Sequence, residues 1–420
     1  MYITKPKFFY GYWIVVAAFF CLFIFGGLMF YAFSLFIKPL QSTFGWGRGE
    51  IMIAMTILFL VSGIASPYIG RMVDRYGARM ITFIGVFAAG LGFASLSIMH
   101  NIWHFYISYI VIALGMVAIG PVPVTAIVSN WFKERRGTAL GITATGVGAG
   151  GLILAPLIGG YLIPIFGWRA SYLALAVLVW ALFVPLILLI RTKPSDMGLY
   201  PDGIEVSQTN AVHGSLTSSP EKLTLKMALT TPTFWLIGLS FLLTAFAGNG
   251  IFQSQVPHLE DIGFSSVIAA ATLGGVGFGS IAGKLFFGWL CDRIPAKYAW
   301  CIALSLTLAS SFILISIKLS SPSAILWLYA IILGVGLGSF IPVLSMLVSS
   351  NFGLSSYGAI FGMLNLLQNI GTATGPLMAG YMYDAMNTYQ WTFIIFIILC
   401  VVALATSFVL GRPRSLLASE

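Results

Sequence analysis

The residue of this sequence with the clearest capacity for chemistry is Lys284, in the apolar stretch AGKLFFG at 282–288. It is the only Asp, Glu, Lys, Arg or His that we place inside the hydrocarbon layer of a membrane. Insertion scales put the cost of a lysine at the centre of a bilayer at about 2.5–3.5 kcal/mol, so its charge must be offset. Because we place no carboxylate inside the hydrocarbon layer, we expect an anionic substrate to supply the missing partner.

An alternative explanation for Lys284 is snorkelling, in which the side chain extends until its ammonium reaches water. Lys284 lies about six residues, or roughly 9 Å, from the predicted end of its window, which is farther than its stem comfortably reaches. Side chains also lean toward the N-terminus of their helix, and here that direction leads to the middle of the membrane. The geometry favours an anion site, and snorkelling stays open as the alternative.

Uncharged polar residues in the same windows are candidates for the remaining substrate contacts. Hydroxyl and amide groups are costly in lipid unless they face a partner or a cavity. The candidates are Tyr31, Asn249, Gln253, Asn365, Gln368 and Asn369. For each of them, a hydrogen bond between helices without substrate contact is at least as plausible. A single positive charge among them suits a monoanion better than a dianion.

The composition shows which elements must position these residues. Of the 420 residues, 59% are hydrophobic and 8% are charged, whereas soluble domains carry about 25% charged residues. A soluble enzyme or a nucleic-acid binder is therefore excluded, even though the net charge is +9. Windows long enough to cross a bilayer as helices fall at 12–37, 50–70, 80–99, 102–128, 138–162, 168–190, 233–256, 266–290, 298–317, 323–349, 356–382 and 390–410. The predicted fold class is an all-α membrane protein with twelve transmembrane helices.

The distribution of basic residues tests this topology, because Lys and Arg accumulate in cytoplasmic loops. With both termini in the cytoplasm, sixteen of the 21 Lys and Arg residues fall on the cytoplasmic side. The outer side carries only Lys38, Arg48, Arg169 and Lys318. A wrong helix count would invert later loops and erase this bias, so the distribution favours twelve crossings. The four cysteines have no metal-type spacing, and we expect no disulfide, metal or cofactor.

Two sets of six windows flank one long polar stretch, and the two sets resemble each other. Pro121 and Pro342 lie 221 positions apart, and Pro156 and Pro376 lie 220 apart. Two six-helix repeats are typical of a transporter that rocks its halves around a central site. The expected parts are an N-terminal six-helix half at 1–190, a cytoplasmic linker at 191–231 and a C-terminal six-helix half at 232–420.

A charged motif, GRMVDRYGAR at 70–79, follows the second window. Its glycine permits close approach of a neighbouring helix, and Asp74 can face the positive N-terminus of a helix that starts on the same side. The pattern Gly-x-x-x-Asp-Arg recurs at 288–293. This recurrence favours a contact on the cytoplasmic side that breaks and re-forms, which we call the inner latch. The alternative is a charged cluster that only fixes the orientation of the helices in the membrane. The residues expected to take part are Gly70, Asp74, Arg75, Arg79, Asp292 and Arg293.

A second motif, GVGAGG at 146–151, precedes Pro156 in the fifth window. It is not a dinucleotide-binding fingerprint, because that motif must follow a strand and open a helix in a soluble unit. Small residues permit close helix packing, and proline permits a kink. We favour a packing face, with a rocking hinge at Pro156 as the alternative. The window at 356–382 repeats the pattern more loosely with Gly371, Gly375 and Pro376.

One histidine, His258, is expected near the outer mouth together with Glu260 and Asp261. An ordinary histidine titrates at about pH 6.5. A functional titration is therefore conceivable, but a histidine in a solvated loop is the favoured interpretation.

The decapeptide at 70–79 resembles the loop signature of the major facilitator superfamily, and it lies where that family carries it. Four shorter stretches together are similar to the bacterial branch of monocarboxylate transporters and oxalate/formate antiporters. They are FYGYW at 9–13, FGWGRGE at 44–50, RRGTALG at 135–141 and PHL at 257–259. The resemblance covers the whole chain, because span count, linker and repeat also agree.

This resemblance implies a role for Lys284 and also marks where the chain departs from the family pattern. In that family a basic residue four positions before the glycine of this segment binds the substrate carboxylate, and Lys284 stands where arginine is usual. A guanidinium holds a carboxylate by two parallel hydrogen bonds, whereas an ammonium acts as a point charge. Proton-coupled animal relatives have an aspartate where this chain has Ser280, and oxalate-type relatives add a second cation that we do not find.

The expected function is secondary transport of a small monocarboxylate such as lactate, pyruvate or formate across the bacterial inner membrane. Proton symport is favoured, and exchange of anions in the manner of oxalate/formate carriers is the alternative. The expected partners are the carboxylate, a proton and the bilayer, with no nucleic acid, and the protein is expected to be a monomer. Efflux of a cation is disfavoured because we place no carboxylate inside the hydrocarbon layer. A non-transporting receptor or scaffold stays open, and an enzyme is not expected because we place no ionisable pair inside the hydrocarbon layer.

Overall fold

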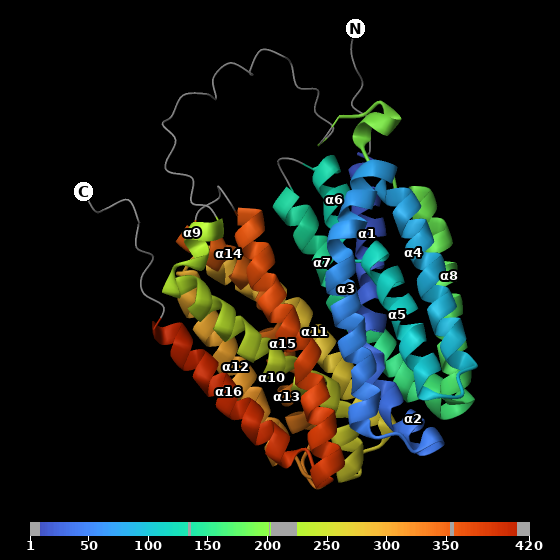
Figure 1. Ribbon diagram of the computed structural model, residues 1–420, viewed down its shortest axis with the longest axis vertical. Coiled ribbons are helices and arrows are strands. Elements are labelled where there is room, and N and C mark those ends of the chain that lie inside the picture. The colour runs from blue at the N-terminus through green and yellow to red at the C-terminus, as the bar shows by residue number, and fades with distance from the viewer. Residues whose placement is uncertain (1–8, 133–135, 201, 203–224, 353–356, 410–420) are drawn as a thin grey trace.

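The computed structural model describes residues 9–132, 136–200, 202, 225–352 and 357–409. Every element in these residues is a helix, and no strand occurs among them. Figure 1 shows two groups of helices, which we call the N-terminal bundle (α1 to α8) and the C-terminal bundle (α10 to α16). The prediction of an all-helical chain is confirmed.

The N-terminal bundle contains α-helices together with two π-helical turns, η1 and η3, and one 3-10 turn, η2. Its elements are α1 (Gly11–Gly26), η1 (Gly27–Tyr31), η2 (Phe33–Phe36), α2 (Ile37–Phe44), α3 (Arg48–Tyr76), α4 (Ala78–Ser97), α5 (Ile102–Ile119), α6 (Pro121–Trp131), α7 (Arg136–Ala155), η3 (Pro156–Leu162) and α8 (Ile163–Leu189). A short 3-10 turn, η4 (Pro194–Met197), follows α8.

The C-terminal bundle is preceded by one short helix that packs against it. The elements are α9 (Leu225–Leu229), α10 (Pro232–Ile262), α11 (Ser266–Cys291), α12 (Ala296–Ser316), α13 (Ser323–Gly338), α14 (Phe340–Phe352), α15 (Tyr357–Met386) and α16 (Gln390–Val409). The breaks between α5 and α6 and between α13 and α14 lie near Pro121 and Pro342, the pair that marks the sequence repeat. Proline has no N–H for the helix ladder, so each break falls beside one.

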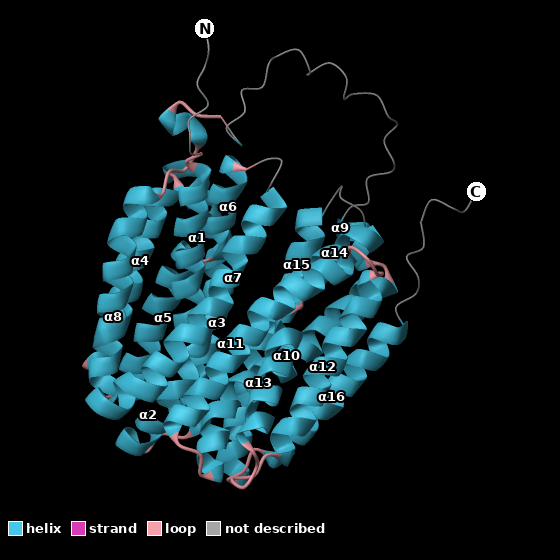
Figure 2. Ribbon diagram, turned by 180° about the vertical axis from the view of Figure 1, so that it is seen from behind, coloured by secondary structure: helices cyan, strands magenta, loops and turns pink. Residues whose placement is uncertain are grey.

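The two bundles are arranged like a V. We name the ends of the molecule after the short helices that mark them, the α9 end and the α2 end. Figures 1 and 2 show the bundles apart at the α9 end and together at the α2 end. Buried apolar residues agree with this shape, because one cluster continues from the N-terminal bundle into α10, α11 and α15, whereas a second cluster lies in the C-terminal bundle with α9.

Ten stretches of the described residues are long and apolar enough to cross a membrane. The windows predicted at 138–162 and 168–190 lie largely within one stretch, Thr138–Ala181. Gly167 interrupts this stretch with φ 75° and ψ 168°, outside the helical region. The window predicted at 356–382 corresponds to α15, a further helix of 30 residues. The count of twelve crossings stays a prediction.

The first predicted helix is not one regular α-helix, which the sequence windows did not show. After α1 ends at Gly26, the chain passes through the π-helical turn η1 and the 3-10 turn η2 before α2 begins. Turns of the π type are frequent at functional sites. Here the irregular segment carries Tyr31 to the face of the N-terminal bundle that meets α10.

Glycines fix the close contacts between α1, α7 and α11. A Cβ added at Gly148 would lie 2.7 Å from the carbonyl oxygen of Gly277 and from Cγ1 of Ile281, both in α11. Additions at Gly146 and Gly150 would meet the backbone of the first helix instead. Because lipid offers no hydrophobic drive for helix association, such close backbone approach supplies much of the packing energy. The packing interpretation of the 146–151 motif is consistent with these contacts.

Candidate functional site

Lys284 lies in α11 on the face that meets the N-terminal bundle. Gly277 and Ile281, two turns and one turn before it, contact Gly148 of α7. The large apolar side chains of Phe278 and Leu285 are exposed on another face of the helix. The Lys284 side chain is itself partly exposed. It therefore lies between the two bundles, on a different side of α11 from the apolar surface.

The ammonium of Lys284 donates a hydrogen bond to the hydroxyl of Ser280, with 3.0 Å between Nζ and Oγ. Ser280 is one turn nearer to the start of α11, so the side chain points back along the helix. In this conformation the ammonium is directed away from the α9 end. That direction is opposite to what snorkelling toward the nearer end of α11 requires.

Tyr31 meets this pair from the other bundle. Its hydroxyl interacts with the hydroxyl of Ser280, and its ring contacts Phe252 of α10 edge-on, with 5.0 Å between ring centroids. A Cβ added at Gly151 of α7 would strike the Tyr31 ring, so glycine at that position makes room for it. Tyr31, Ser280 and Lys284 thus form one polar group at the interface of the bundles, which we call the central triad.

No carboxylate is within ion-pair distance of Lys284 among the residues that the structure describes. The ion pairs found there all involve Lys38 or Arg48 at the α2 end. The Lys284 charge is therefore met by a neutral hydroxyl. A neutral partner leaves the positive charge uncompensated, so the arrangement is able to bind an anion.

Two of the predicted amide contacts make hydrogen bonds between helices. Gln253 Nε2 donates to the carbonyl of Phe30 in η1 at 3.0 Å, which joins the two bundles beside Tyr31. The Oε1 atom of Gln253 is buried and has no partner among the described residues. Asn249 Nδ2 donates to the carbonyl of Thr372 in α15 at 2.6 Å, so it links two helices of one bundle. Both contacts match the interhelical alternative.

The other three predicted contacts, Asn365, Gln368 and Asn369, lie in α15 and are partly exposed. They occupy the turns of α15 that precede Thr372, toward the α9 end. Their role as substrate contacts stays a prediction.

The α2 end holds a cluster of charged residues across the two bundles that sequence reasoning missed. Arg48, the first residue of α3, is only 2% exposed. Its guanidinium donates to both carboxylate oxygens of Asp261 in α10, at 2.7 and 2.9 Å. Lys38 of α2 lies 2.8 Å from the same carboxylate. The ring of Tyr383 from α15 lies 3.6 Å from the guanidinium carbon, measured to the ring centroid.

A second carboxylate, Asp384 of α15, completes this cluster. It accepts the backbone N–H groups of Arg48 at 2.8 Å and Gly49 at 2.7 Å, and so caps the N-terminus of α3 from the other bundle. We call Lys38, Arg48, Asp261 and Asp384 the α2-end clamp. The sequence placed these residues in or beside predicted loops of the outer side, which indicated that they lie at the same end of the molecule. It did not show which residues pair, because the partners are more than two hundred positions apart.

The interpretation of His258 as a solvated loop residue is wrong. The helix predicted to end at 256 continues to Ile262, so His258 lies inside α10 and is 9% exposed. Its ring contacts Phe393 and Tyr389 edge-on, with centroid distances of 4.9 and 5.9 Å. The hydropathy window ended just before Pro257, whereas α10 accommodates this proline in its interior.

The expected inner latch lies at the α9 end, where the bundles are apart. Among the described residues, a Cβ added at Gly70 would meet only Val122 at 3.7 Å, and one added at Gly288 would meet nothing within 4 Å. Among the described residues, therefore, no neighbouring helix approaches either glycine closely in this conformation. The Asp74 side chain and the start of the facing segment, residues 353–356, lie outside the described residues. The charged members Arg75, Arg79, Asp292 and Arg293 are exposed.

The two predicted hinge prolines occupy different surroundings. Pro156 begins the π-helical turn η3 and lies against Gly274 of α11, where an added Cβ would be 2.9 Å from the proline Cγ. Pro376 is buried inside the continuous helix α15. Only Pro156 of this pair coincides with a change in helix type. A hinge role for either proline stays a prediction.

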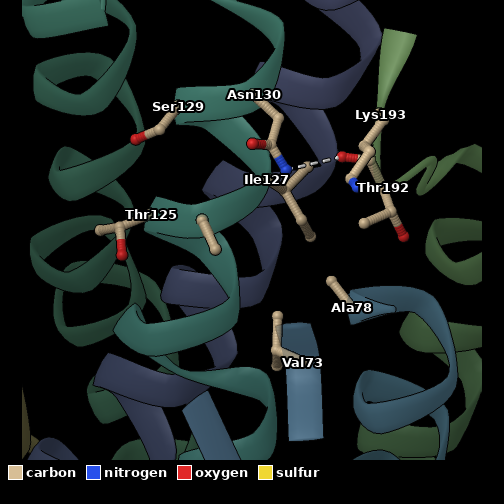
Figure 3. Close-up of a pocket in the computed structure, with 9 residues that line it drawn as sticks. Val73, Ala78, Thr125, Ile127, Ser129, Asn130, Thr192 and Lys193 are labelled. Carbon is tan, nitrogen blue, oxygen red and sulfur yellow. Dashed lines mark hydrogen bonds between the residues drawn. The ribbon is translucent and has the colours of Figure 1, made fainter. Parts of the chain in front are cut away.

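A cavity of about 500 Å³ lies inside the N-terminal bundle at the α9 end. Figure 3 shows it between the end of α3, the start of α4, the polar residues of α6 and the segment that carries Thr192 and Lys193. Asn130 Nδ2 donates to the carbonyl of Thr192 at 3.1 Å and closes one side. Lys284 does not line this cavity, so it is separate from the central triad. Within the described chain, no group of three His, Cys, Asp or Glu could hold a metal ion.

Solved structures with the same arrangement of helices include a bacterial homolog of the human lysosomal transporter Spinster. Its inward-facing, unoccupied form matches with a TM-score of 0.74 and 17% identity, and 98% of each chain is covered. The occupied inward-facing form matches with a TM-score of 0.75 and 15% identity over 97% of this chain and 98% of the other. At this identity the likeness shows the fold alone.

Similar sequences include monocarboxylate transporters of mammals. Monocarboxylate transporter 13 of Rattus norvegicus is 24% identical over 92% of this chain and 85% of its own length. Monocarboxylate transporter 11 of Homo sapiens is 26% identical over 96% of this chain and 83% of its own length. The family model of the Major Facilitator Superfamily matches residues 18–371 and 246–419, which together span most of the sequence. This multi-pass membrane chain therefore belongs to the Major Facilitator Superfamily.

Proposed function

We propose that this protein is a secondary transporter of small monocarboxylate anions that works by alternating access between its two bundles. The observation that carries the proposal is the position of Lys284, whose ammonium lies between the bundles and is bonded to a neutral hydroxyl. A charge held without a counter-ion in an apolar interior favours binding of an anion there. The names of the mammalian relatives, which are monocarboxylate transporters, add support.

The proposed substrates are acids of lactate, pyruvate or formate size. One ammonium balances one carboxylate, whereas a dianion would bring an unpaired negative charge into the site. Tyr31 and Gln253 are the proposed neutral contacts, since each lies next to the interface between the bundles. The other proposed contacts, from α10 and α15, are Asn249, Asn365, Gln368 and Asn369.

The proposed topology has twelve crossings with both termini in the cytoplasm. Thr138–Ala181 has 44 residues, which is roughly twice the length needed to cross a bilayer. It is proposed to cross twice and to turn at Gly167, and α15 supplies the remaining crossing. The halves are then residues 1–190 and 232–420, joined by a linker at 191–231. The abundance of Lys and Arg at the α9 end supports a cytoplasmic location for that end.

In this topology the conformation is closed toward the outside and open toward the cytoplasm. The α2-end clamp holds the outer side shut, and the described charged residues of the inner latch, Arg75, Arg79, Asp292 and Arg293, are exposed. An anion that pairs with Lys284 neutralises the site and lowers the cost of passing through the closed intermediate. The proposed location is the bacterial inner membrane, and the proposed working unit is a monomer.

Proton symport is the proposed coupling, and anion exchange of the oxalate/formate type is the alternative. No carboxylate of the described residues reaches the central triad, so the proton must be carried by Lys284 or by the substrate itself. A separate argument supports exchange. An empty carrier that closes must bury the unpaired ammonium of Lys284, which costs free energy. Both modes use the same anion site.

The test is uptake of labelled C1 to C4 carboxylates into proteoliposomes that are preloaded with the same unlabelled acid. We expect Lys284→Ala to lose uptake by about 100-fold or more, the range for removing one partner of a buried charge pair. Lys284→Arg should retain part of it, and Lys318→Ala, an exposed lysine at the α2 end, should match the parent. Unchanged uptake in Lys284→Ala would remove this residue from the mechanism. No uptake by the parent would favour a receptor or scaffold.

A further inference from the structure

The central triad forms a chain of three polar groups that crosses the interface between the bundles. Lys284 donates to the Ser280 hydroxyl, and that hydroxyl also interacts with the hydroxyl of Tyr31. Ser280 is 7% exposed and Tyr31 is 4% exposed. Each hydroxyl therefore depends on its protein neighbours for hydrogen bonds, since a buried polar group without one is costly.

Serine differs from a carboxylate in what it can offer to a lysine. A hydroxyl both donates and accepts, whereas an ionised carboxylate only accepts. Toward an ammonium, Ser280 accepts from Nζ and its own hydrogen is free to be donated to the Tyr31 oxygen. Toward a neutral amine, the same hydroxyl can turn and donate to Nζ while it accepts from Tyr31. The direction of the chain reverses without movement of any heavy atom.

Among the residues that the structure describes, no competing proton acceptor lies beside the pair. The elements packed against α11 are α7, η3, α10, α12, α13 and α14, and Tyr31 of η1 reaches Ser280. The described charged residues of these elements lie at helix ends, with Lys297 at the start of α12 and both Glu260 and Asp261 at the end of α10. The titratable ring of His258, near the same end of α10, packs against Phe393 of α16. Among the described residues, no charged group acts on Lys284. A proton that enters this interface therefore has the Lys284 amine as its acceptor.

We propose that Lys284 and Ser280 form a combined proton and anion site, in which Ser280 is a positioning residue that serves Lys284 in both of its protonation states. This inference rests on the proposed function and specifies how its coupling works. Ser280 holds Nζ toward the middle of the molecule whether or not the nitrogen is charged. The lack of a carboxylate partner among the described residues is what allows the lysine to give up its proton.

The proposed cycle conserves charge and protons. When the site is open to the outside, the lone pair of Nζ takes a proton from a hydronium ion, and a carboxylate pairs with the resulting ammonium. After the bundles rock, the carboxylate leaves to the cytoplasm, and Nζ then returns its proton to water there. The empty carrier goes back with a neutral amine bonded to Ser280. One acid anion and one proton have moved together.

Two kinds of uptake separate this inference from the proposed function. Exchange, measured in preloaded proteoliposomes, needs only an anion site. Net uptake into empty vesicles, driven by a lower pH outside, also needs the site to lose its charge on the return step. A parent protein that fails in both assays refutes the proposed function itself. A parent that performs both allows the variants to test the proton site.

The decisive variant is Lys284→Arg, because a guanidinium binds carboxylates but cannot be deprotonated in a protein. We expect it to retain exchange and to lose net uptake by about tenfold or more, with exchange independent of pH. Retained exchange also shows that the variant is folded. If Lys284→Arg keeps both net uptake and its acceleration at low outside pH, the proton travels on the substrate and the inference is refuted.

The role of Ser280 is tested by three substitutions under the same two assays. Ser280→Ala should raise the KM for exchange by about 2- to 10-fold, the effect of one lost hydrogen bond, and should shift the pH profile of net uptake. Ser280→Thr, which keeps a hydroxyl, should restore the profile. Ser280→Asp should hold the ammonium and suppress net uptake more than exchange. Ser305→Ala, at a serine of α12 that bonds to the carbonyl of Cys301 in its own helix, serves as the control. A pH profile of Ser280→Ala identical to that of the parent refutes the positioning role.

Discussion

At the α2 end a cluster of charged residues pairs across the two bundles, whereas at the α9 end basic residues are numerous and some of them contact aromatic rings of their own bundle. Arg48 at the α2 end is 2% exposed and is bonded to Asp261 of the opposite bundle. Arg75 and Arg293 at the α9 end are exposed, and each lies over an aromatic ring of its own bundle. Charge therefore joins the two bundles at one end and makes contacts within a bundle at the other.

This difference has an energetic consequence for the conformational equilibrium. Removal of one partner of a buried, hydrogen-bonded ion pair costs about 3–5 kcal/mol. Exposed ion pairs contribute about 0–1 kcal/mol. A single substitution in the α2-end clamp should therefore shift the balance between closed and open forms. Comparable changes among the exposed charges at the α9 end should have small effects in this conformation.

Ser34 offers a reporter position for opening of the α2 end. It lies in η2, which packs on α10 of the other bundle, and is 1% exposed. Ser34→Cys is nearly isosteric, and a membrane-impermeant maleimide added from outside should reach this reporter thiol only when the bundles part at this end. The four native cysteines are buried, so the parent protein supplies the background.

The largest effect is expected from Asp261→Ala in the Ser34→Cys background. It leaves the buried guanidinium of Arg48 without its carboxylate, so the closed form loses about 3–5 kcal/mol. We expect the labelling rate of the reporter thiol to rise by about tenfold or more. The exchange of charges in Arg48→Asp combined with Asp261→Arg should restore part of the protection. If Asp261→Ala labels no faster than the reporter variant alone, the clamp does not hold this end closed.

A smaller effect is expected from Gly277→Val, which acts on the crossing of α7 and α11 near the middle of the molecule. The added Cβ would lie 2.5 Å from the backbone nitrogen of Leu152, so the helices must separate. Overpacking of this kind costs about 1–3 kcal/mol. The melting temperature of the purified protein in detergent should fall. Gly288→Val, at a position with open space among the described residues, is the matched control, and equal melting temperatures for the two variants would contradict the packing role.

The smallest effect is expected from Asp384→Ala, which removes the cap that α15 gives to the start of α3. The Asp384 carboxylate accepts two backbone N–H groups there, and loss of a helix cap costs about 0.5–2 kcal/mol. Labelling of the reporter thiol should increase, but less than in Asp261→Ala. A larger increase than in Asp261→Ala would show that the cap, rather than the ion pair, holds the bundles together.

Much of the fold could be predicted from the sequence because the bilayer imposes length and polarity on each helix. The apolar windows located nearly every long helix, and the proline offsets of 220 and 221 marked elements that occupy matching places in both bundles. The irregular segment from Gly27 to Phe36 was not predictable, since hydropathy averages over a window and does not register a change in helix type. The end of α10 was misplaced for a related reason, because Pro257 is tolerated inside that helix.

Of the candidate site, the sequence predicted the charged residue but not the contacts that other helices make with it. Lys284 was evident from its cost in lipid, and the departure at Ser280 was visible in the sequence. The contact between these two residues follows from their spacing of four in a helix, but the approach of Tyr31 from the other bundle does not. The pairing of Arg48 with Asp261 joins residues 213 positions apart, and no periodicity within either helix carries that information.

The central claim is that Lys284 supplies the positive charge that binds an acid anion between the bundles. Its most direct test is equilibrium binding of radiolabelled lactate, pyruvate and formate to the purified protein in detergent, with Lys284→Ala and Lys318→Ala measured in parallel. We predict saturable binding of at least one of these monoanions by the parent and by Lys318→Ala. We also predict that Lys284→Ala weakens this binding by about 30-fold or more, as expected for a lost buried charge partner. Equal affinity of Lys284→Ala and the parent would contradict the claim.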